Sequence, residues 1–397
     1  FDGTDKIVIT TATSNPQILN SSFSTSVVNA TGTANFKFVE VFKNHIFFSG
    51  DASNKQQLSF MGPNLTNDFT TNNGGGVIKV DTEIVGLKAF RDTLFIFGQD
   101  KIFKLTGTSS SNFAVQPVTR SIGCTDGRSI QELAGDVVFL APDGLRTIAG
   151  TERIDDIELG TVSKQIQKRI NEITTHNINS VVIRNKSQYR LFFPTSTSQA
   201  EDSSRGLLSV IKANPNTGQL GFEYGDVKGL KVSSADSGFI LGTETILSGG
   251  YDGYVYKQES GNVFTQAATT KNISSIYRSP DMTMGDPGIR KSFQKVIWNI
   301  DPTGALSSSF LLEYDFSDDE VPQPEPYTLS QTGNIAQYGL SESVFGTAVY
   351  GSTGSNLIRQ PVEGSGFTVA AKILDATNNS PVALKGFEME FIAGGRR

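Results

Sequence analysis

The chain has 397 residues, a formal net charge of −6 and a sequence pI of about 5.2. This acidic balance disfavours stable nucleic-acid binding, because proteins that hold phosphates cluster Lys and Arg on one surface. No run approaches the roughly 18 to 20 apolar residues of a membrane-spanning helix, and the first residues lack the charged and then apolar pattern of a signal peptide.

A recurrent unit runs through the first three quarters of the chain: an apolar strand, a polar turn, a stronger apolar strand, then a Gly or Asp-Gly turn and an aromatic strand. Its clearest copies are Val39 to Gly50, Leu87 to Leu105, Leu133 to Ile148, Val181 to Phe193 and Thr245 to Lys257. Their starts fall roughly 40 to 60 residues apart, close to the spacing of β-propeller blades. With 40 glycines for turns and 27 phenylalanines for pleated surfaces, the chain is predicted to be all-β. We expect an irregular β-propeller over residues 1–288.

Two of these strands are apolar at every position. They are Leu94-Phe-Ile-Phe97 and Val137-Val-Phe-Leu140. A strand that is exposed on one face alternates apolar and polar residues, so a continuous run predicts burial on both faces by neighbouring blades. The dipeptides Asp143-Gly144 and Asp252-Gly253 suit two-residue hairpin turns, where glycine adopts a positive φ without a Cβ clash.

One segment departs from the β pattern and predicts a short amphipathic helix near 162–173. Its apolar residues stand at helical spacing, at Val162, Ile166, Ile170 and Ile173. On the polar side, Lys164, Lys168 and Arg169 form a basic face. We interpret the helix as the cap of a propeller edge, and the alternative is that this basic face meets a partner subunit.

A domain boundary is expected between Arg278 and Arg290, where turn-forming residues are dense. Beyond it, residues 289–397 contain strand-like runs separated by polar loops, as in a small β-sandwich. These runs are Phe293 to Ile300, Ser308 to Phe316, Val344 to Tyr350, Phe367 to Ile373 and Ala383 to Ile392. The acidic, proline-rich segment from Ser317 to Pro326 is expected to be extended and solvated.

The sequence shows no catalytic, cofactor-binding or metal-binding constellation. Its two histidines, His45 and His176, neighbour no nucleophile motif, and there is neither a CxxC nor an HExxH pattern for zinc. The single cysteine, Cys124, has no partner in the chain and is interpreted as a buried structural thiol. The pairs Asp155-Asp156 and Asp318-Asp319 are interpreted as surface acidity. We therefore expect no enzyme, no cofactor and no metal site.

A string in the middle of the chain resembles the nozzle proteins of short-tailed bacteriophages, also called tail tubular protein B or stabilisation proteins. The string comprises Gln116-Pro-Val-Thr-Arg120, Ile122-Gly-Cys124, Gly127-Arg-Ser129, Pro142-Asp-Gly-Leu-Arg146 and Gly150-Thr-Glu-Arg153. The likeness is best between Glu40 and Ile173, and it returns in Gly249-Gly-Tyr-Asp-Gly253 and in Gly386 to Arg396.

This resemblance implies a structural virion protein in the phage tail, with an irregular propeller and extra β domains. Such subunits form a homo-oligomeric ring, which is expected here to be a hexamer. The ring attaches to a tail adaptor protein and offers sites to tail fibres. Its centre forms the exit channel for double-stranded DNA. The acidic balance fits a lumen along which DNA slides without stable binding. Within such a ring, Lys164, Lys168 and Arg169 are the predicted interface residues.

A second hypothesis belongs to a different class: a carbohydrate-binding or glycan-cleaving β-propeller at a cell surface. It would require exposed Tyr and Phe beside carboxylates in a pocket, and cleavage would require two facing carboxylates. A nozzle subunit would instead require extensive lateral faces.

Overall fold

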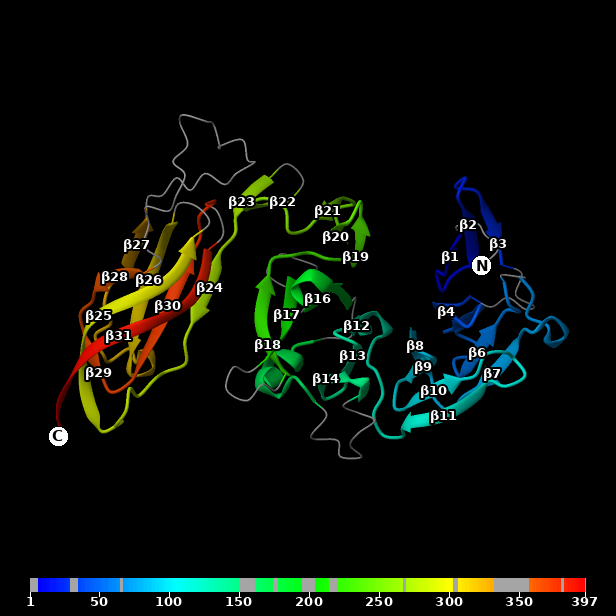
Figure 1. Cartoon of the computed structure of the whole chain (residues 1–397), viewed down its shortest axis with the longest axis horizontal. Helices are drawn as coiled ribbons and strands as arrows, with labels where there is room; N and C mark the ends of the chain where they lie inside the picture. The colour runs from blue at the N-terminus through cyan, green and yellow to red at the C-terminus, as the bar shows by residue number, and fades with distance from the viewer. Residues whose placement is uncertain are drawn as a thin grey trace. The chain divides into compact units, whose positions relative to one another are not determined.

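The computed structural model describes residues 6–28, 35–64, 67–149, 161–173, 178–194, 204–213, 220–266, 269–302, 306–331, 357–379 and 382–396. The regular secondary structure of these residues is almost wholly antiparallel β-strand, in two compact units, Phe1–Glu259 and Ser260–Arg397 (Figure 1). The fold class predicted from the sequence is confirmed. The division between the units lies ahead of the turn-rich segment at which we expected it, because β24 (Ser275–Arg278) pairs with β30 (Val369–Asp375) of the second unit.

The described residues of the first unit form six small sheets of three or four strands, which follow one another in chain order. We number them 1 to 6. Sheet 1 is β1 (Lys6–Ile9), β2 (Gln17–Asn20) and β3 (Thr25–Val27); sheet 2 is β4 (Phe38–Phe42), β5 (His45–Ser49), β6 (Gln57–Phe60) and β7 (Gly76–Lys79). Sheet 3 is β8 (Ile84–Phe90), β9 (Thr93–Gly98), β10 (Ile102–Thr106) and β11 (Ala114–Thr119); sheet 4 is β12 (Gln131–Leu133), β13 (Asp136–Ala141) and β14 (Gly144–Thr147). Sheet 5 is β15 (Asn179–Ile183), β16 (Gln188–Pro194), β17 (Ser204–Ala213) and β18 (Leu220–Lys228); sheet 6 is β19 (Ser234–Ile240), β20 (Thr243–Gly249) and β21 (Val255–Lys257).

These sheets are arranged as the blades of an irregular propeller. The first strands of successive sheets contact one another, β4 with β8, β12 with β15 and β15 with β19. Sheet 3 meets sheet 4 through the short 3-10 helix η2 (Gly127–Ser129), which contacts β8 and β13. Each sheet is a meander of consecutive strands, so its first strand lies innermost and the later strands follow outward.

An apolar cluster fills every junction between successive sheets of the first unit. Strand β9 shows how one strand serves two junctions. Leu94 and Ile96 join the cluster shared with sheet 2, whereas Phe95 and Phe97 join the cluster shared with sheet 4. Because side chains alternate between the faces of a strand, a continuously apolar run is buried on both sides. The both-face burial predicted for Leu94–Phe97 and Val137–Leu140 is confirmed.

The predicted amphipathic segment forms two short pieces, η3 (Lys164–Ile166) and α2 (Gln167–Ile170), instead of one helix from 162 to 173. Its apolar face is as predicted, because Ile170 is buried and the other three apolar residues pack on the cluster between sheets 4 and 5. The helix is shorter because Ser163 accepts a hydrogen bond from Leu145 N, at 2.9 Å, and does not cap the helix. The remaining short helices of the described residues are η1 (Thr71–Asn73), η4 (Arg184–Lys186) and η6 (Asp315–Ser317).

The second unit contains a sandwich of two sheets and a separate hairpin. One sheet has the order β24-β30-β26-β27, with β26 (Leu306–Tyr314) and β27 (Tyr327–Gln331). The other has the order β28-β25-β29, with β31 also paired to β25: β25 (Ile289–Pro302), β28 (Leu357–Pro361), β29 (Ser365–Gly366) and β31 (Val382–Arg396). The hairpin is β22 (Val263–Gln266) and β23 (Thr269–Asn272). The expected strand from Val344 to Tyr350 lies outside the described residues.

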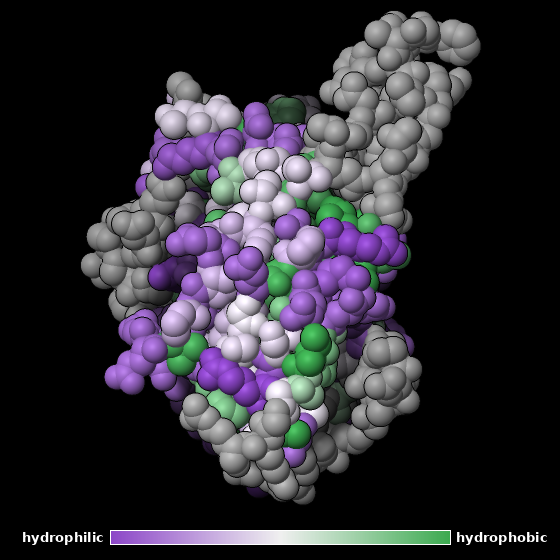
Figure 2. Space-filling view, turned by 90° about the vertical axis from the view of Figure 1, so that its left-hand side faces the viewer, coloured by the Kyte–Doolittle hydropathy of each residue, from purple (hydrophilic) through white to green (hydrophobic). Residues whose placement is uncertain are grey.

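One apolar core lies between the two sheets of the sandwich. Trp298 of β25 is fully buried there, and its ring meets that of Phe310 of β26 edge to face, with 5.2 Å between the ring centres. On the outer side, the ion pairs Lys295–Glu390 and Lys385–Asp301 link β25 to β31. Viewed from the side of this unit, hydrophobic residues are scattered among hydrophilic ones (Figure 2). Asp318 and Asp319 are exposed in an irregular loop, as predicted.

Candidate functional site

The described part of the nozzle-like string forms a joint between sheets 3, 4 and 5. Two glycines allow the close approach: a Cβ on Gly123 would lie 2.1 Å from the carbonyl of Gln99, and one on Gly127 would lie 2.1 Å from the carbonyl oxygen of Val85. Between them, Cys124 N donates to the carbonyl of Gly98 at 2.8 Å. Sheet 3 is thereby packed directly against the segment that leads into sheet 4.

Ser129 connects this segment to sheets 4 and 5. Its hydroxyl donates to the carbonyl of Asp126 and accepts from Leu140 N at 3.1 Å. The phenol of Tyr189, on β16, donates to the carbonyl of Ser129 at 2.8 Å, and Ser180, on β15, donates to the carbonyl of Arg128 at 2.6 Å. Burial raises the pKa of Tyr189, which therefore stays protonated and able to donate.

Cys124 lies inside this joint and is fully buried, as the sequence predicted. Its sulfur lies 3.3 Å from the carbonyl oxygen of Asp126. Burial raises the pKa of the thiol to about 12, because the thiolate would be formed in an apolar cluster. A thiol in this environment is a packing group.

The second part of the string surrounds the hairpin between β13 and β14. Its two loop residues are Pro142 and Asp143, and Gly144, with φ of 136°, begins β14. The turn thus lies one residue earlier in the chain than the Asp143-Gly144 turn that we expected. Arg146 is buried and donates to the Asp143 carboxylate through Nε at 2.9 Å, and Thr161 donates to the same carboxylate at 2.8 Å. Burial alone would raise the pKa of Asp143, but these hydrogen bonds outweigh it and lower the pKa.

The three predicted interface residues lie on the helical segment beside this hairpin. Lys164 and Lys168 are exposed, and no described residue pairs with them. Arg169 is engaged within the chain, since its guanidinium pairs with Asp226 of β18 at 2.9 Å and with Glu172 at 3.1 Å. The two lysines therefore make up the free positive charge of this face, and their role at an interface stays a prediction.

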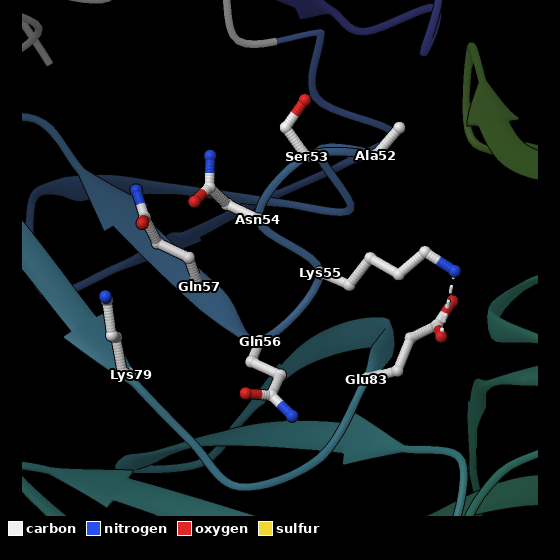
Figure 3. Close-up of a pocket in the computed structure, with 8 residues that line it drawn as sticks. All are labelled: Ala52, Ser53, Asn54, Lys55, Gln56, Gln57, Lys79 and Glu83. Atoms are coloured by element: carbon white, nitrogen blue, oxygen red, sulfur yellow. Dashed lines mark hydrogen bonds and ion pairs between the residues drawn. The ribbon is translucent and has the colours of Figure 1, made fainter.

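A polar surface pocket of about 390 Å³ lies on sheet 2 (Figure 3). It is lined by the consecutive residues 52–57 with Lys79 and Glu83. Gln57 and Lys79 stand opposite each other on β6 and β7, and the ammonium of Lys55 pairs with the carboxylate of Glu83 at 3.1 Å. The pocket contains one carboxylate and no aromatic side chain.

A second pocket, of about 250 Å³, lies between the outer parts of sheets 3 and 4. Its lining includes Phe90, Phe95 and one carboxylate, that of Asp136. This carboxylate accepts from the backbone N–H groups of Val137 at 2.7 Å and of Ala149 at 3.1 Å. Each of the two pockets thus has a single carboxylate, whereas glycoside hydrolysis uses a facing pair.

Of the two histidines and the two acidic pairs, the structure describes His45 and the pair Asp318-Asp319. His45 is buried and donates from Nδ1 to the carbonyl of Met61 at 2.7 Å, as expected of a core histidine. His176 and the pair Asp155-Asp156 lie outside the described residues. Among the residues that the structure describes, no three His, Cys, Asp or Glu side chains are grouped to hold a metal ion. No described helix is long and apolar enough to span a membrane.

Sequence reasoning missed the residues that hold the joint together across sheets, chiefly Ser180 and Tyr189. They are distant in sequence from Arg128 and Ser129, and nothing in the sequence around them predicts the contact. A signal did exist within η2: Asp126 precedes Gly127-Arg-Ser129 in the position of an N-cap, and its carboxylate accepts from Arg128 N at 2.8 Å.

Comparison with protein-family models and with curated proteins found no match. Among solved structures, the chain is similar to Kluyveromyces lactis Hsv2p, with 11% identity and a TM-score of 0.32 over 56% of this chain and 70% of that one. It is similar to the RRP9 WD40 repeats, with 11% identity and a TM-score of 0.37 over 62% and 69%. It is also similar to an exo-β-1,3-galactanase from Phanerochaete chrysosporium, with 8% identity and a TM-score of 0.28 over 97% and 100%. These likenesses are too distant to carry a functional inference.

Proposed function

We propose that the chain is a structural subunit of the ring-shaped tail nozzle of a short-tailed bacteriophage, through which duplex DNA leaves the particle. The observation that carries the proposal is the role of the nozzle-like string in this molecule. Its described residues Gly127 and Ser129, together with Tyr189 of β16, fix three sheets to one another through close backbone contact and buried hydrogen bonds. The resemblance thus rests on residues that maintain architecture, as a conduit requires.

The remaining parts of the proposal follow from the ring. Six copies around the channel would attach to a tail adaptor protein on one side and offer tail fibres their outer rim, and the subunit would have no enzymatic activity. With a net charge of −6, the subunit can present carboxylates to the lumen. Such a lumen repels phosphates and lets the duplex pass without the contacts that Lys and Arg would make.

Electron microscopy of the chain in its purified source material tests this proposal. A sixfold ring with a central channel, below a portal and an adaptor, is the expected result. A channel lined mainly by Lys and Arg would contradict the account of DNA passage. Free chains that bind or cleave a glycan would replace the proposal with the carbohydrate function.

Charge reversal tests the predicted interface on the helical segment. The double variant K164E/K168E is expected to weaken ring assembly, measured by sedimentation, because two exposed ammonium groups would be replaced by carboxylates. Circular dichroism should stay unchanged, since both side chains are exposed. The matched control is K79E, which reverses an exposed lysine on sheet 2. Assembly equal to that of the unmodified chain would remove both lysines from the interface.

A further inference from the structure

In the irregular propeller of the first unit, the first and last blades, sheets 1 and 6, each expose large apolar side chains on one face. At every internal junction the apolar side chains of one sheet cover those of the next. Among the described residues of the first unit, sheet 1 packs on sheet 2 alone and sheet 6 packs on sheet 5 alone. In stacked repeats the terminal units normally carry a polar outer face, because solvent is their only neighbour.

Sheet 6 is firmly held on sheet 5, which fixes the direction of its outer face. Ile246 is buried in the cluster between the two sheets, and the amide of Asn179 donates to the carbonyl of Ser233 at 2.6 Å. Glu259, which follows β21, accepts hydrogen bonds from Lys186 of η4 and from Arg190 of β16. The residues that alternate with Ile246 on β20 therefore point away from sheet 5.

The outer face of sheet 6 exposes several large apolar side chains among charged ones. Leu247 is 41% exposed, and the exposed Asp236 of β19 and Lys257 of β21 lie opposite it. Val255, on the same face of β21 as Lys257, is 71% exposed. Ile240, on the same face of β19, is 56% exposed, and Leu241 in the adjoining turn is fully exposed. A single exposed leucine needs no explanation, but four large apolar residues on one small sheet do.

Sheet 1 has the same arrangement at the other end of the stack. Ile18 is buried against sheet 2, whereas Ile7 and Ile9 point the other way and are 61% and 40% exposed. Val27 lies across from Gln17 in the same row as Ile9 and is 48% exposed, and Phe23 in the adjoining turn is 84% exposed. The described residues of the first unit therefore leave both end faces uncovered.

We propose that these two faces bind each other between copies of the chain, sheet 6 of one copy against sheet 1 of the next. Every chain carries both faces, so the contact repeats head to tail, and such heterologous contacts close into a ring or continue as a filament. This inference deepens the proposed nozzle function and rests on it for the closure of the ring.

The apolar area on each face fits a second copy. At about 150 Å² for a fully exposed large apolar side chain, the low end of the aromatic range, each face together with its adjoining turn presents on the order of 400 Å². A standard interface buries about 800 Å² on each partner, of which about 57% is non-polar, or roughly 450 Å². The exposed apolar residues thus supply the non-polar part of one ordinary interface, and the polar groups around them supply its rim.

Cross-linking between two differently tagged chains tests the contact. One chain carries I9C and the other V255C, and the native Cys124 stays unreactive because it is fully buried. A short bifunctional maleimide should join the two kinds of chain into pairs. The matched control replaces V255C with V77C, an exposed valine of sheet 2. Yields no higher than in this control would overturn the inference, as would a chain carrying both substitutions that cross-links only within itself.

A second variant separates the inference from the proposed function. L247K/V255K should lower the association of the chain at least tenfold by sedimentation, whereas V77K should leave it unchanged. Cross-linked pairs or filaments in a particle without a nozzle ring would support the contact and contradict the nozzle. A nozzle ring that forms without the I9C–V255C cross-link would support the nozzle and contradict the contact.

Discussion

Gly127 lies so close to a neighbouring strand that no larger residue fits its position. The nearest atom to an added Cβ is a backbone oxygen, that of Val85, at 2.1 Å, so a rotamer change cannot relieve the clash. We expect G127A to lower the free energy of unfolding by about 1–3 kcal/mol, the usual cost of overpacking. Urea unfolding measures the difference.

The control for this substitution is G225A on β18. An added Cβ there would meet no atom within 4 Å, and the alanine reduces the conformational freedom of the unfolded chain. G225A should therefore be neutral or slightly stabilising. Equal losses in the two variants would show that the contact with Val85 is not the cause.

Asp143 predicts a pH dependence with a definite sign. The pKa of Asp143 is lowered in the folded chain from its ordinary value of 3.8. The ionised carboxylate therefore stabilises the fold fully at pH values above the pKa that Asp143 has in the unfolded chain. This stabilisation is lost as the pH falls through the pKa of the folded chain. We expect D143N to be less stable than the unmodified chain at pH 7, and we expect this difference in stability to narrow as the pH falls below 3.8 and through the folded pKa of Asp143. Urea midpoints at a series of pH values measure this, with D319N, at an exposed loop carboxylate, as control. A difference that does not change with pH would contradict the assignment.

At the scale of the elements, the short helical segment should contribute through its apolar face. Ile170 is buried in the cluster between sheets 4 and 5, so I170A should lower the free energy of unfolding by about 2–4 kcal/mol through lost burial and a cavity. Its neighbour Lys168 is exposed, and K168A should change stability by less than about 0.5 kcal/mol. Thermal unfolding of the two variants compares them directly; similar midpoints would mean that the segment does not contribute to the core.

The elements that were predictable from the sequence are those whose burial leaves a pattern along the chain. The runs at Leu94–Phe97 and Val137–Leu140 are apolar throughout because both of their faces are covered. This continuous apolar pattern was enough to predict strands buried between neighbouring blades. Strand β23, by contrast, is exposed at every residue and has no apolar period, so its pairing with β22 could not be predicted.

The other differences between the predicted and the observed structure arise because tertiary contacts compete with local ones. Ser163 stands where a helix N-cap is expected, but its hydroxyl accepts from Leu145 N, a partner that the local sequence cannot reveal. The joint was recognisable as a string of residues, yet its bonds to Ser180 and Tyr189 depend on how sheet 5 packs. Contacts of this kind depend on the assembled fold and leave no periodic pattern of apolar residues in the local sequence.

At the scale of the whole molecule, the chain has one intrinsic probe in each unit. Its only cysteine is buried in the first unit and its only tryptophan, Trp298, is buried in the second. Each unit has its own apolar core, so we expect the two to unfold with separate midpoints. Tryptophan fluorescence and the reaction of Cys124 with a thiol reagent, followed along one urea series, measure them. Coincident midpoints would mean a single cooperative transition.

The stack of sheets also determines where the first unit opens. Its contacts run from each sheet to the next, so it behaves as a one-dimensional array whose stability is a sum over neighbouring pairs. In such an array the terminal members are held on one side only, and amide hydrogens there exchange soonest, while the middle sheets exchange last. A subunit joined at both ends to its neighbours would have no terminal member, and fraying would then require breaking the ring itself.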